Sequence, residues 1–543
     1  MRYCLAFLLF FAASGSWGQS TDFPINHAVY GLMDFEEIRS SKSFSSTIKP
    51  YSRASVFQHL DGIESPYLSK ELRRFTLDSS RSKKSFLQKI YQYPADFFFY
   101  QDNNVELHFN PMVQFSIGRS DDPIGTTYVN SRGVEVRGTI DERISFYTSL
   151  TENQVRYPQY VNTIRDSTLT IPFEGFWKQF NDTGVDFLRA QGYIDFGLSK
   201  SISAQLGFGK HFIGTGQRSL ILSNYANNYP YLRINTETRI FDYTNIFAEL
   251  IGDVQGNAGG TFGTAGFSKK YMAFHHLNVK IKPNLHIGLF ESVMYGDSTG
   301  GLSYEYMIPV IFYRSVEQQN GSDDNAFVGM DFKWNILNRY ALYGQLLIDE
   351  LVVSELIDGT GSWRNKQGIQ IGLKYIDAFG LKNLMLQGEL NSVRPYTYAH
   401  EDAFTSHSHY NLALAHPLGA NFTEFLSRAV YRLNDQWTFE GVLLSATYGN
   451  DIGSENFGRD ILKNYTIRRN VPNPDFGNEH LQGNKTDLLM LFARTTFMPR
   501  HNVFLDLDFT YRKETGQGFN LDERTSVLGI SFRWNMPART YLF

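Results

Sequence analysis

The sequence predicts an all-β membrane protein: an antiparallel transmembrane β-barrel of about eighteen strands, preceded by a small helical plug or periplasmic segment. Three observations predict this fold. Apolar and polar residues alternate in many segments of strand length, short and long connections alternate between them, and an export signal stands in front. A soluble β-sandwich can use the same alternation, but the recurring hairpins behind an export signal favour the barrel.

The last two predicted strands show the alternation most clearly. Between 503 and 512, every second residue is apolar or aromatic: Val503, Leu505, Leu507, Phe509 and Tyr511. Between 526 and 535 the same face carries Leu528, Ile530, Phe532 and Trp534. Successive side chains of a strand point to opposite faces, so one face here is apolar and the other is polar.

The first eighteen residues are predicted to be a signal peptide, with Arg2 before an apolar run at 5–13 and Ser16 and Gly18 before the cut. Cys4 is the only cysteine of the chain. We therefore expect neither disulfides nor a cysteine-based metal or redox site in the mature protein. No later window offers about 18 unbroken apolar residues, so no transmembrane helix is expected.

Composition agrees with a barrel and excludes some partners. The chain has 32 tyrosines and 45 phenylalanines, a net charge of −4 and a mean hydropathy of −0.31. A negative value suits a barrel, because half of its strand residues face the lumen and its loops are wet. No long basic run occurs, so nucleic-acid binding is not expected.

The segment before the barrel divides into two parts. Residues 19–50 show little periodicity and are predicted to be irregular. Residues 51–104 form the predicted helical plug or periplasmic segment, because Leu68, Leu72 and Phe75 follow helical spacing. Lysine and arginine outnumber acidic residues between 66 and 91. This basic face either meets solvent or belongs to a plug that faces an acidic polymer or lumen.

The barrel is predicted over 105–543, with both termini in the periplasm and the long loops outside the outer membrane of a Gram-negative cell. The predicted strands start near 105, 132, 143, 189, 203, 232, 245, 270, 285, 325, 340, 366, 383, 424, 437, 486, 502 and 526. Short turns are expected at 140–143, 198–202, 241–245, 282–285, 337–339, 379–383, 434–436 and 498–502. Long loops are expected at 119–131, 152–188, 211–231, 253–269, 296–324, 349–365, 394–423, 450–485 and 514–525. Outer-membrane barrels have short periplasmic turns and long outer loops.

Two patterns that suggest chemistry have simpler explanations. The glycines between Gly207 and Gly216 lack the spacing of a phosphate-binding loop and more simply ease a strand end. His400, His407, His409 and His416 lie close together in the sequence, but no partner stands at a diagnostic metal-ligand spacing. No nucleophile-elbow or zinc-protease signature is present. We therefore expect no enzyme activity, metal or cofactor.

The long loops are rich in tyrosine and asparagine, most densely at 223–231. Aromatic faces combined with amides suit sugars, which present apolar ring faces and many hydroxyls. A loop lid packed on itself explains the same composition, and this alternative stays open.

Two stretches resemble known families. The residues Phe187-Leu188-Arg189, Leu206 to Lys210 and Gly214 to Ala226 are similar to the Wzi-type capsule-assembly proteins. The residues His416-Pro417-Leu418-Gly419-Ala420-Asn421 resemble related RemB-type gliding-motility barrels. The resemblance implies an eighteen-stranded outer-membrane barrel with a helical plug that binds surface polysaccharide and is not an enzyme. The chain departs from the family's W-G-P-G-like turn at 212–216.

The loops 211–231 and 394–421 are therefore predicted to form a shared surface patch for cell-surface polysaccharide. The predicted ligand-binding residues are Lys210, Arg218, Asn224, Tyr225, Tyr229, Tyr231, Tyr396, Tyr398, His400 and His409. Lys210 and Arg218 are expected to pair with uronate carboxylates. Expected partners are outer-membrane lipid, polysaccharide and other outer-membrane proteins of a motility or secretion complex. The alternatives are a component of such a gliding or secretion assembly, and a porin or substrate channel.

Overall fold

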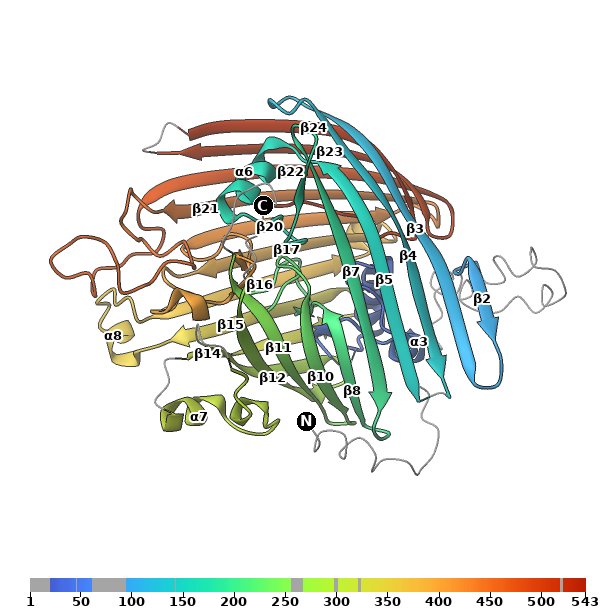
Figure 1. The fold of residues 1–543 in the computed structure, drawn as a ribbon, viewed down its shortest axis with the longest axis horizontal. Coiled ribbons are helices and arrows are strands. Elements are labelled where there is room, and N and C mark those ends of the chain that lie inside the picture. The colour runs from blue at the N-terminus through green and yellow to red at the C-terminus, as the bar shows by residue number, and fades with distance from the viewer. Residues whose placement is uncertain are drawn as a thin grey trace.

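The computed structural model describes residues 20–44, 46–60, 94–141, 143–254, 267–296, 301–320, 324–517 and 521–543. Eighteen antiparallel strands close into one barrel (Figure 1), as the sequence predicts. They are β3 (Val105–Ser120), β4 (Thr126–Ile140), β5 (Ile144–Arg156), β7 (Gly184–Gly197), β8 (Ile202–Gly209), β10 (Tyr229–Glu237), β11 (Phe241–Asp253), β12 (Ser268–Lys282), β13 (Leu285–Tyr295), β14 (Asn325–Ile336), β15 (Tyr340–Glu350), β16 (Lys366–Ile376), β17 (Leu384–Val393), β20 (Phe422–Arg432), β21 (Trp437–Asn450), β22 (Asn484–Arg500), β23 (Val503–Gly516) and β24 (Leu521–Trp534). The ring closes where β24 pairs with β3, with Trp534 opposite Val113.

Smaller elements lie before the barrel and in its connections. The helices are α2 (Ala28–Ser40), α3 (Arg53–Leu60), α6 (Gln159–Thr168), α7 (Tyr313–Asn320) and α8 (Val353–Ile357), with the 3₁₀ turns η2 (Glu305–Met307), η3 (Ala378–Gly380) and η4 (Ala403–Thr405). The short strands are β1 (Ile48–Lys49), β2 (Phe98–Gln101), β6 (Lys178–Phe180), β9 (Phe212–Ile213), β18 (Ser408–His409) and β19 (Leu412–Ala413).

The eight predicted tight turns and seven of the nine predicted long loops are present, but the long loops predicted at 119–131 and 514–525 are wrong, because the flanking strands extend and leave only 121–125 and 517–520 as connections. Asn338, Asn383 and Asn502 lie in tight turns with φ of 56°, 64° and 59°. Asparagine tolerates this left-handed region better than most residues, because its short amide bonds locally to the backbone. The eight predicted tight turns therefore stand at one end of the barrel, and the seven long loops stand at the other together with the short connections after β3 and β23. Which end faces the cell exterior stays a prediction.

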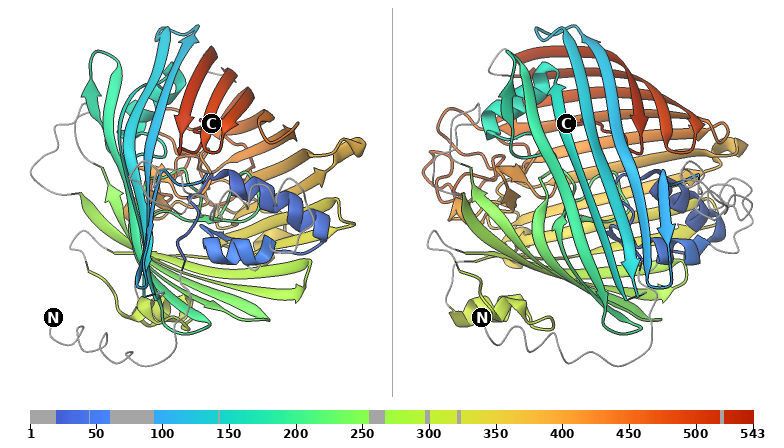
Figure 2. Two further views of the ribbon diagram at one scale, coloured as in Figure 1. Left: turned by 90° about the vertical axis from the view of Figure 1, so that its right-hand side faces the viewer. Right: turned by 45° about the vertical axis from the view of Figure 1, so that its right-hand side comes forward.

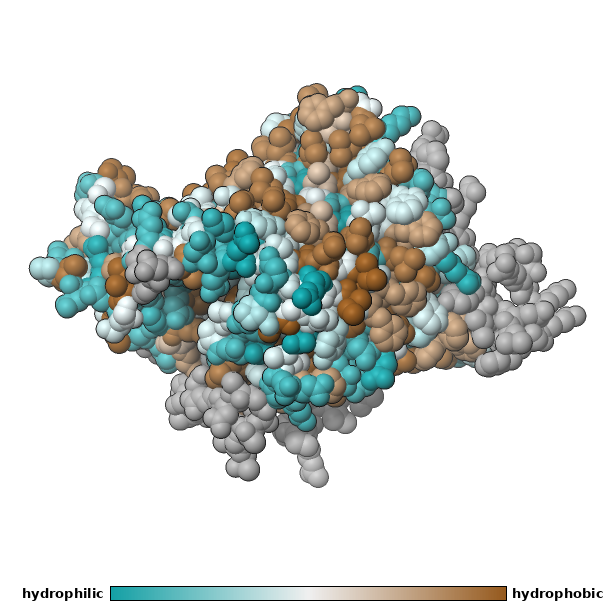
Figure 3. Space-filling model, turned by 90° about the horizontal axis from the view of Figure 1, so that it is seen from above, coloured by the Kyte–Doolittle hydropathy of each residue, from teal (hydrophilic) through white to brown (hydrophobic). Residues whose placement is uncertain are grey.

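The barrel wall has the predicted apolar outside. On β23 and β24, Leu507 is 50% exposed and Ile530 is 60% exposed, whereas the inward Asp506 is 5% exposed. Figure 3 shows hydrophobic side chains gathered over the wall, with hydrophilic ones toward the long-loop end on the left. Such an apolar belt around a polar interior is the pattern of a membrane barrel. Among the described residues, no helix combines the length and the apolar character needed to cross a membrane.

Charged residues on the polar inner face of the strands pair with groups on neighbouring strands and on the chain after β24. Arg533 contacts Asp506 at 2.6 Å, and Arg428 contacts Glu440 at 2.6 Å. Arg512 donates from Nε to the carbonyl oxygen of Phe543 at 3.0 Å. These inward charges on the strands are therefore compensated by neighbouring groups rather than free.

The helix α2 corrects the prediction that residues 19–50 are irregular. It lies within the ring of strands near the tight-turn end (Figure 2) and contacts β14 and β16. His27 caps its first turn, with Nδ1 accepting from the Val29 amide at 3.2 Å. Asp34 pairs with Lys374 at 2.8 Å, and Glu37 pairs with Lys333. Barrel cations thus hold an acidic helix in the lumen.

The predicted helical segment is described only in part. The helix α3 agrees with the helical pattern that begins near residue 52. The basic stretch between 66 and 91 lies outside the described residues, and the boundaries between the segments stay predictions.

Candidate functional site

Two long connections fold into the barrel instead of standing above it. The segment 210–228 connects β8 to β10, and the segment 394–421 connects β17 to β20. They meet inside the long-loop end, where the Ser223 amide donates to the Leu414 carbonyl oxygen at 2.7 Å. The hydroxyl of Tyr398 donates to the Leu220 carbonyl oxygen at 2.7 Å. The two predicted loops are therefore neighbours, as expected.

The segment 210–228 is also tied to the N-terminal plug. Strand β1 pairs with β9, with Ile48 opposite Ile213. Next to this pair, the Gly214 amide donates to the Thr47 carbonyl oxygen at 2.9 Å. The plug and the infolded loops thus form one continuous filling of the lumen.

The predicted tyrosines lie in the interior rather than on an exposed patch. The exposed fraction is between 0 and 5% for Tyr225, Tyr229, Tyr231, Tyr396 and Tyr398. The ring of Tyr225, for example, packs edge-on against Phe173 and Phe543. This arrangement matches the alternative of a loop lid packed on itself. The ligand-binding role of these residues stays a prediction.

The two predicted cations are also engaged by the protein. Lys210 donates from Nζ to the carbonyl oxygens of Phe173, Asn224 and Ala226 at 2.9, 3.1 and 2.8 Å. Burial lowers the pKa of Lys210 to about 7. Arg218 forms an ion pair with the fully buried Glu424 at 2.9 Å. In this structure both side chains fasten the infolded segments.

The predicted asparagine and the four histidines serve as hydrogen-bonding groups. Asn224 donates from Nδ2 to Oδ1 of Asn26 at 3.3 Å, which joins the loop to the plug. The Thr405 hydroxyl contacts Nδ1 of His400 at 2.8 Å. The buried rings of His407, His409 and His416 contact the Ile221 carbonyl oxygen, the Asn228 carbonyl oxygen and Glu424 at 2.8, 3.1 and 3.0 Å.

Burial keeps two of these histidines neutral. It lowers the pKa of His407 to about 4 and that of His409 to about 3. Neutral imidazole rings suit a packed interior, because a charged ring would lose its hydration there. In the described part of the chain, no three His, Cys, Asp or Glu side chains are placed to share a metal ion.

A half-buried aromatic cluster lies in two other long loops. The ring centres of Trp363 and Tyr465 are 4.7 Å apart. Arg468 lies 4.5 Å from the Trp363 ring centre, and Lys366 lies 4.6 Å from that of Tyr465. We name these four residues the 363/465 cluster. The predicted His400 packs edge-on against Tyr465, with the two ring centres 5.7 Å apart.

The cluster was missed because its two rings lie in loops that are about a hundred residues apart in the sequence. The only signal in the sequence was a tryptophan in a long loop. Partly exposed ring faces held beside ion-paired cations provide a fixed apolar surface. Such a surface matches the apolar face of a sugar ring.

The comparisons with known proteins agree with this architecture. Residues 117–542 match the family model described as capsule assembly protein Wzi. A solved structure of Wzi from Escherichia coli, described as an outer membrane protein involved in group 1 capsule assembly and a carbohydrate-binding β-barrel, has a TM-score of 0.56 and 10% identity, and the match covers 96% of this chain and 100% of that one. Pseudomonas aeruginosa OprD has a TM-score of 0.42 and 8% identity, over 79% of this chain and 94% of that one. No curated protein matches the sequence.

Proposed function

Because the chain belongs to the Wzi capsule-assembly family, we propose that it binds cell-surface polysaccharide at the long-loop end of an outer-membrane barrel and does so without catalysis. The observation that carries this proposal is the closure of that end. The infolded segments pack into one buried core with the barrel wall, which includes Leu220, Tyr398 and Phe422. A barrel filled in this way is suited to present a surface rather than to conduct a solute.

The 363/465 cluster is the part of this surface that we assign to the polymer. Its rings offer stacking faces. Lys366 is buried and pairs with Asp349 at 2.8 Å, and Arg468 pairs with Asp475, so these cations hold the rings in place. Each aromatic contact contributes about 0.5–1.5 kcal/mol, so a single cluster binds weakly. Retention of a polymer then depends on several copies of the barrel holding several sugar repeats of the same polysaccharide at once.

One predicted tyrosine, Tyr396, contributes to this proposal by positioning the loop 451–483, which carries Tyr465. The Tyr396 amide donates to the Gly458 carbonyl oxygen at 2.8 Å, and the Tyr396 hydroxyl donates to the Asn456 carbonyl oxygen at 2.9 Å. We infer that Tyr396 affects polysaccharide binding through the loop it holds.

We propose that the long loops face the cell exterior and that both termini belong to the periplasmic side. The support is that all seven long loops lie at one end of the barrel, as in outer-membrane barrels. A role in a gliding or secretion assembly is the second candidate, and it rests only on the resemblance of 416–421 to the RemB-type barrels.

The test removes both stacking rings by the double substitution Trp363→Ala and Tyr465→Ala. Two lost contacts of about 0.5–1.5 kcal/mol each weaken binding about fivefold to a hundredfold. We expect more polysaccharide in the medium and less on the cells, with heat-modifiability confirming an assembled barrel. The control is Phe379→Ala, an aromatic ring that is 84% exposed at the tight-turn end. Unchanged retention in an assembled double variant contradicts the proposal.

A further inference from the structure

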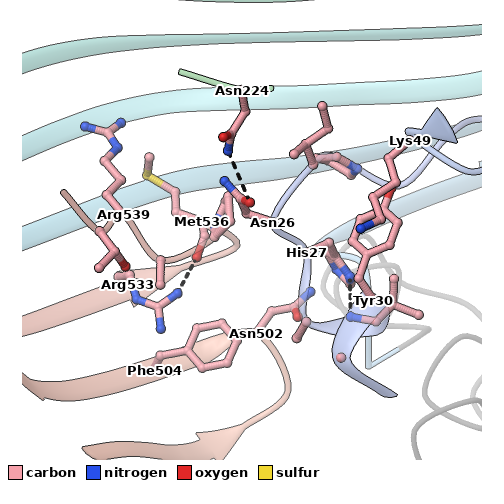
Figure 4. Close-up of a pocket in the computed structure, with 18 of the residues that line it drawn as sticks. Asn26, His27, Tyr30, Lys49, Asn224, Asn502, Phe504, Arg533, Met536 and Arg539 are labelled. Atoms are coloured by element: carbon pink, nitrogen blue, oxygen red, sulfur yellow. Dashed lines mark hydrogen bonds between the residues drawn. The ribbon is translucent and has the colours of Figure 1, made fainter. Parts of the chain in front are cut away.

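A second site is suggested by a cavity inside the barrel that the outer loops do not use. Its volume is about 540 Å³, within the usual range of ligand pockets. It extends from the tight turns at Gln436 and Asn502 past the plug to the infolded segment at Asn224. Figure 4 shows Asn26, Asn224 and Arg539 around it, with Lys49 and Tyr30 farther along the plug.

The cavity wall carries an excess of positive charge. Twelve lysines and arginines line it against six aspartates and glutamates. Three further carboxylates, those of Glu424, Asp506 and Asp508, pair with lining arginines from outside the cavity. Four lining cations form no ion pair with a carboxylate among the described residues. Lys210 is bonded to three carbonyl oxygens instead, which leaves Lys49, Arg53 and Arg539.

Arg53 is the most unusual of the three. It is 8% exposed, and its Nε is buried without a hydrogen-bond partner among the described residues. Its guanidinium lies 4.1 Å from the ring centre of Phe23. The carboxylates of Glu135 and Asp96 act on Arg53 from a distance, but neither forms an ion pair with it. An anion that bonds directly to this buried guanidinium would therefore be stabilised.

The other two cations repeat the pattern. Arg539 donates from Nη2 to Oδ1 of Asn153 at 2.8 Å, while its Nε and Nη1 are buried with no partner in the described structure. Lys49 lies 4.8 Å from the ring centre of Phe212 and 5.6 Å from that of Tyr30. Burial lowers the pKa of Lys49 to about 8 and that of Arg53 to about 10.

We propose that this cavity binds a short acidic oligosaccharide, entered from the tight-turn end, whose carboxylates pair with Arg53 and Arg539. Amides of Asn26 and Asn224 lie in the same cavity and suit sugar hydroxyls, and the rings of Tyr30 and Phe504 suit apolar sugar faces. The site does not depend on the 363/465 cluster, because it lies on the opposite side of the infolded segments.

The test uses the full chain in detergent and trigalacturonic acid as the probe, with the neutral maltotriose as the comparison ligand and calorimetry as the readout. We expect saturable binding of trigalacturonic acid only. The double substitution Arg53→Gln and Arg539→Gln should weaken it at least tenfold, while Lys382→Gln, an exposed cation at the same end, should leave it unchanged. If the double variant fails to assemble, Arg539→Gln alone should weaken binding at least threefold.

Two results would overturn this site: no saturable binding of trigalacturonic acid by the wild-type chain, or equal affinity in the assembled double variant. Retention of polysaccharide on cells is a separate readout. Normal retention with lost trigalacturonic acid binding separates the inner site from the proposed outer one.

A second inference concerns the outside of the barrel wall. Residues 304–316 fold over the outer face of β10 to β13 instead of over the lumen. Tyr306 and Tyr313 pack there in one buried cluster with Phe247 and Val293, and the Tyr243 hydroxyl donates to the Pro309 carbonyl oxygen at 2.5 Å. The interior faces of the same strands carry Phe274 and Phe290, which belong to the lumen core.

This cover hides two polar side chains on the lipid-facing wall. His275 contacts Glu291 at 3.1 Å, and the Glu291 carboxylate accepts from the amides of Tyr313 and Arg314 at 3.0 and 2.9 Å. A carboxylate facing lipid is costly, and the start of α7 satisfies it here. The cover itself turns apolar side chains outward, since Tyr304, Val310 and Phe312 are 79, 80 and 77% exposed.

We infer that the segment 304–312 is embedded in membrane lipid beside the barrel. Its apolar face continues the lipid-facing belt, where Leu289 is 51% and Val328 is 42% exposed on the neighbouring strands. The only cysteine of the chain is Cys4 in the predicted signal, so a single label site is simple to introduce.

The test labels Val310→Cys with an environment-sensitive NBD group in doxyl-lipid vesicles, with Thr466→Cys, exposed in the loop 451–483, as the control. We expect a blue-shifted emission quenched by doxyl lipid at 310 and neither effect at 466. Solvent-like emission at 310 contradicts the inference. A blue shift without doxyl quenching also overturns it and assigns the face to a protein partner.

Discussion

The buried ion pair between Arg218 and Glu424 offers a direct test of how the long-loop end is closed. Arg218 donates from Nη2 to Oε1 of Glu424 at 2.9 Å. Its Nε lies 3.2 Å from each of the two carboxylate oxygens of Glu424. It also donates to the Leu542 carbonyl oxygen at 2.6 Å. The pair therefore joins the infolded segment 210–228, the strand β20 and the chain after β24.

The substitution Arg218→Met should be costly because it leaves a fully buried carboxylate without its cation. Breaking a buried pair in this way typically costs about 3–5 kcal/mol. His416 and Asn391 still contact Glu424 at 3.0 and 3.1 Å, which places the expected loss at the lower end, about 3 kcal/mol. The double substitution Arg218→Met and Glu424→Gln removes the orphaned charge and should recover most of this loss.

The assay is urea unfolding of the barrel in lipid vesicles, with single-channel conductance as the second readout. Arg218→Met should lower the free energy of unfolding and open brief conducting states, because the infolded segment loses its anchor. Arg314→Met is the control, since the ion pair of Arg314 with Glu317 is exposed and contributes little. A single variant within about 0.5 kcal/mol of wild type, below the 3–5 kcal/mol expected for a buried pair, would refute the reasoning.

The remaining predictions address the loops, pH and topology. Tyr398→Phe leaves the buried Leu220 carbonyl oxygen without its donor, so it should cost about 1–3 kcal/mol in the same urea assay, whereas no change would mean that the bond is not needed. The pKa values of His407 and His409, about 4 and 3 in the fold, lie below the unfolded value of about 6.5. Their contribution to the free energy of unfolding is therefore complete above about pH 6.5 and is lost as the pH falls toward those folded values. The substitution His409→Gln should make the free energy of unfolding fall less steeply between about pH 6 and 4. A pH profile equal to that of the wild type would contradict this prediction. Protease added to intact cells should cut within 451–483 and spare the tight turn at 283–284, and the reverse pattern would invert the proposed orientation.

The strands were predictable because each one faces two different solvents. A wall with lipid outside and a polar lumen inside requires apolar and polar residues to alternate along each strand, and this alternation is visible in the sequence. Strands β13, β15 and β16 begin at the predicted residues Leu285, Tyr340 and Lys366. Strand β4 begins at Thr126, six residues earlier than predicted, because the adjacent Tyr128 and Val129 interrupt the alternation of apolar and polar residues.

The helix α2 was not predictable by the same logic. Helix periodicity appears when one face meets solvent, but α2 is enclosed by protein and buries Glu36 and Glu37 as well as apolar residues. Its acidic side chains are matched by lysines from strands hundreds of residues later in the chain. Only the closed barrel brings these partners together.

The candidate site was predictable in its parts but not in its burial. The sequence indicated that the loops 211–231 and 394–421 belong together, and they do meet. Their tyrosine and asparagine content is equally suited to an exposed patch and to a lid packed on itself, since both need ring packing and amide hydrogen bonds. Trp363 and Tyr465 come together only through the folded loops, as does the excess of cations in the inner cavity.

The most direct test of the central claim is the binding of purified cell-surface polysaccharide to the barrel in lipid nanodiscs, measured at equilibrium. The account predicts saturable binding that the double substitution Trp363→Ala and Tyr465→Ala weakens at least about fivefold, from two lost aromatic contacts. Phe379→Ala should bind as the wild type does. No polysaccharide binding by the wild-type barrel, or equal binding by the assembled double variant, would contradict the claim that the long-loop end holds the polymer.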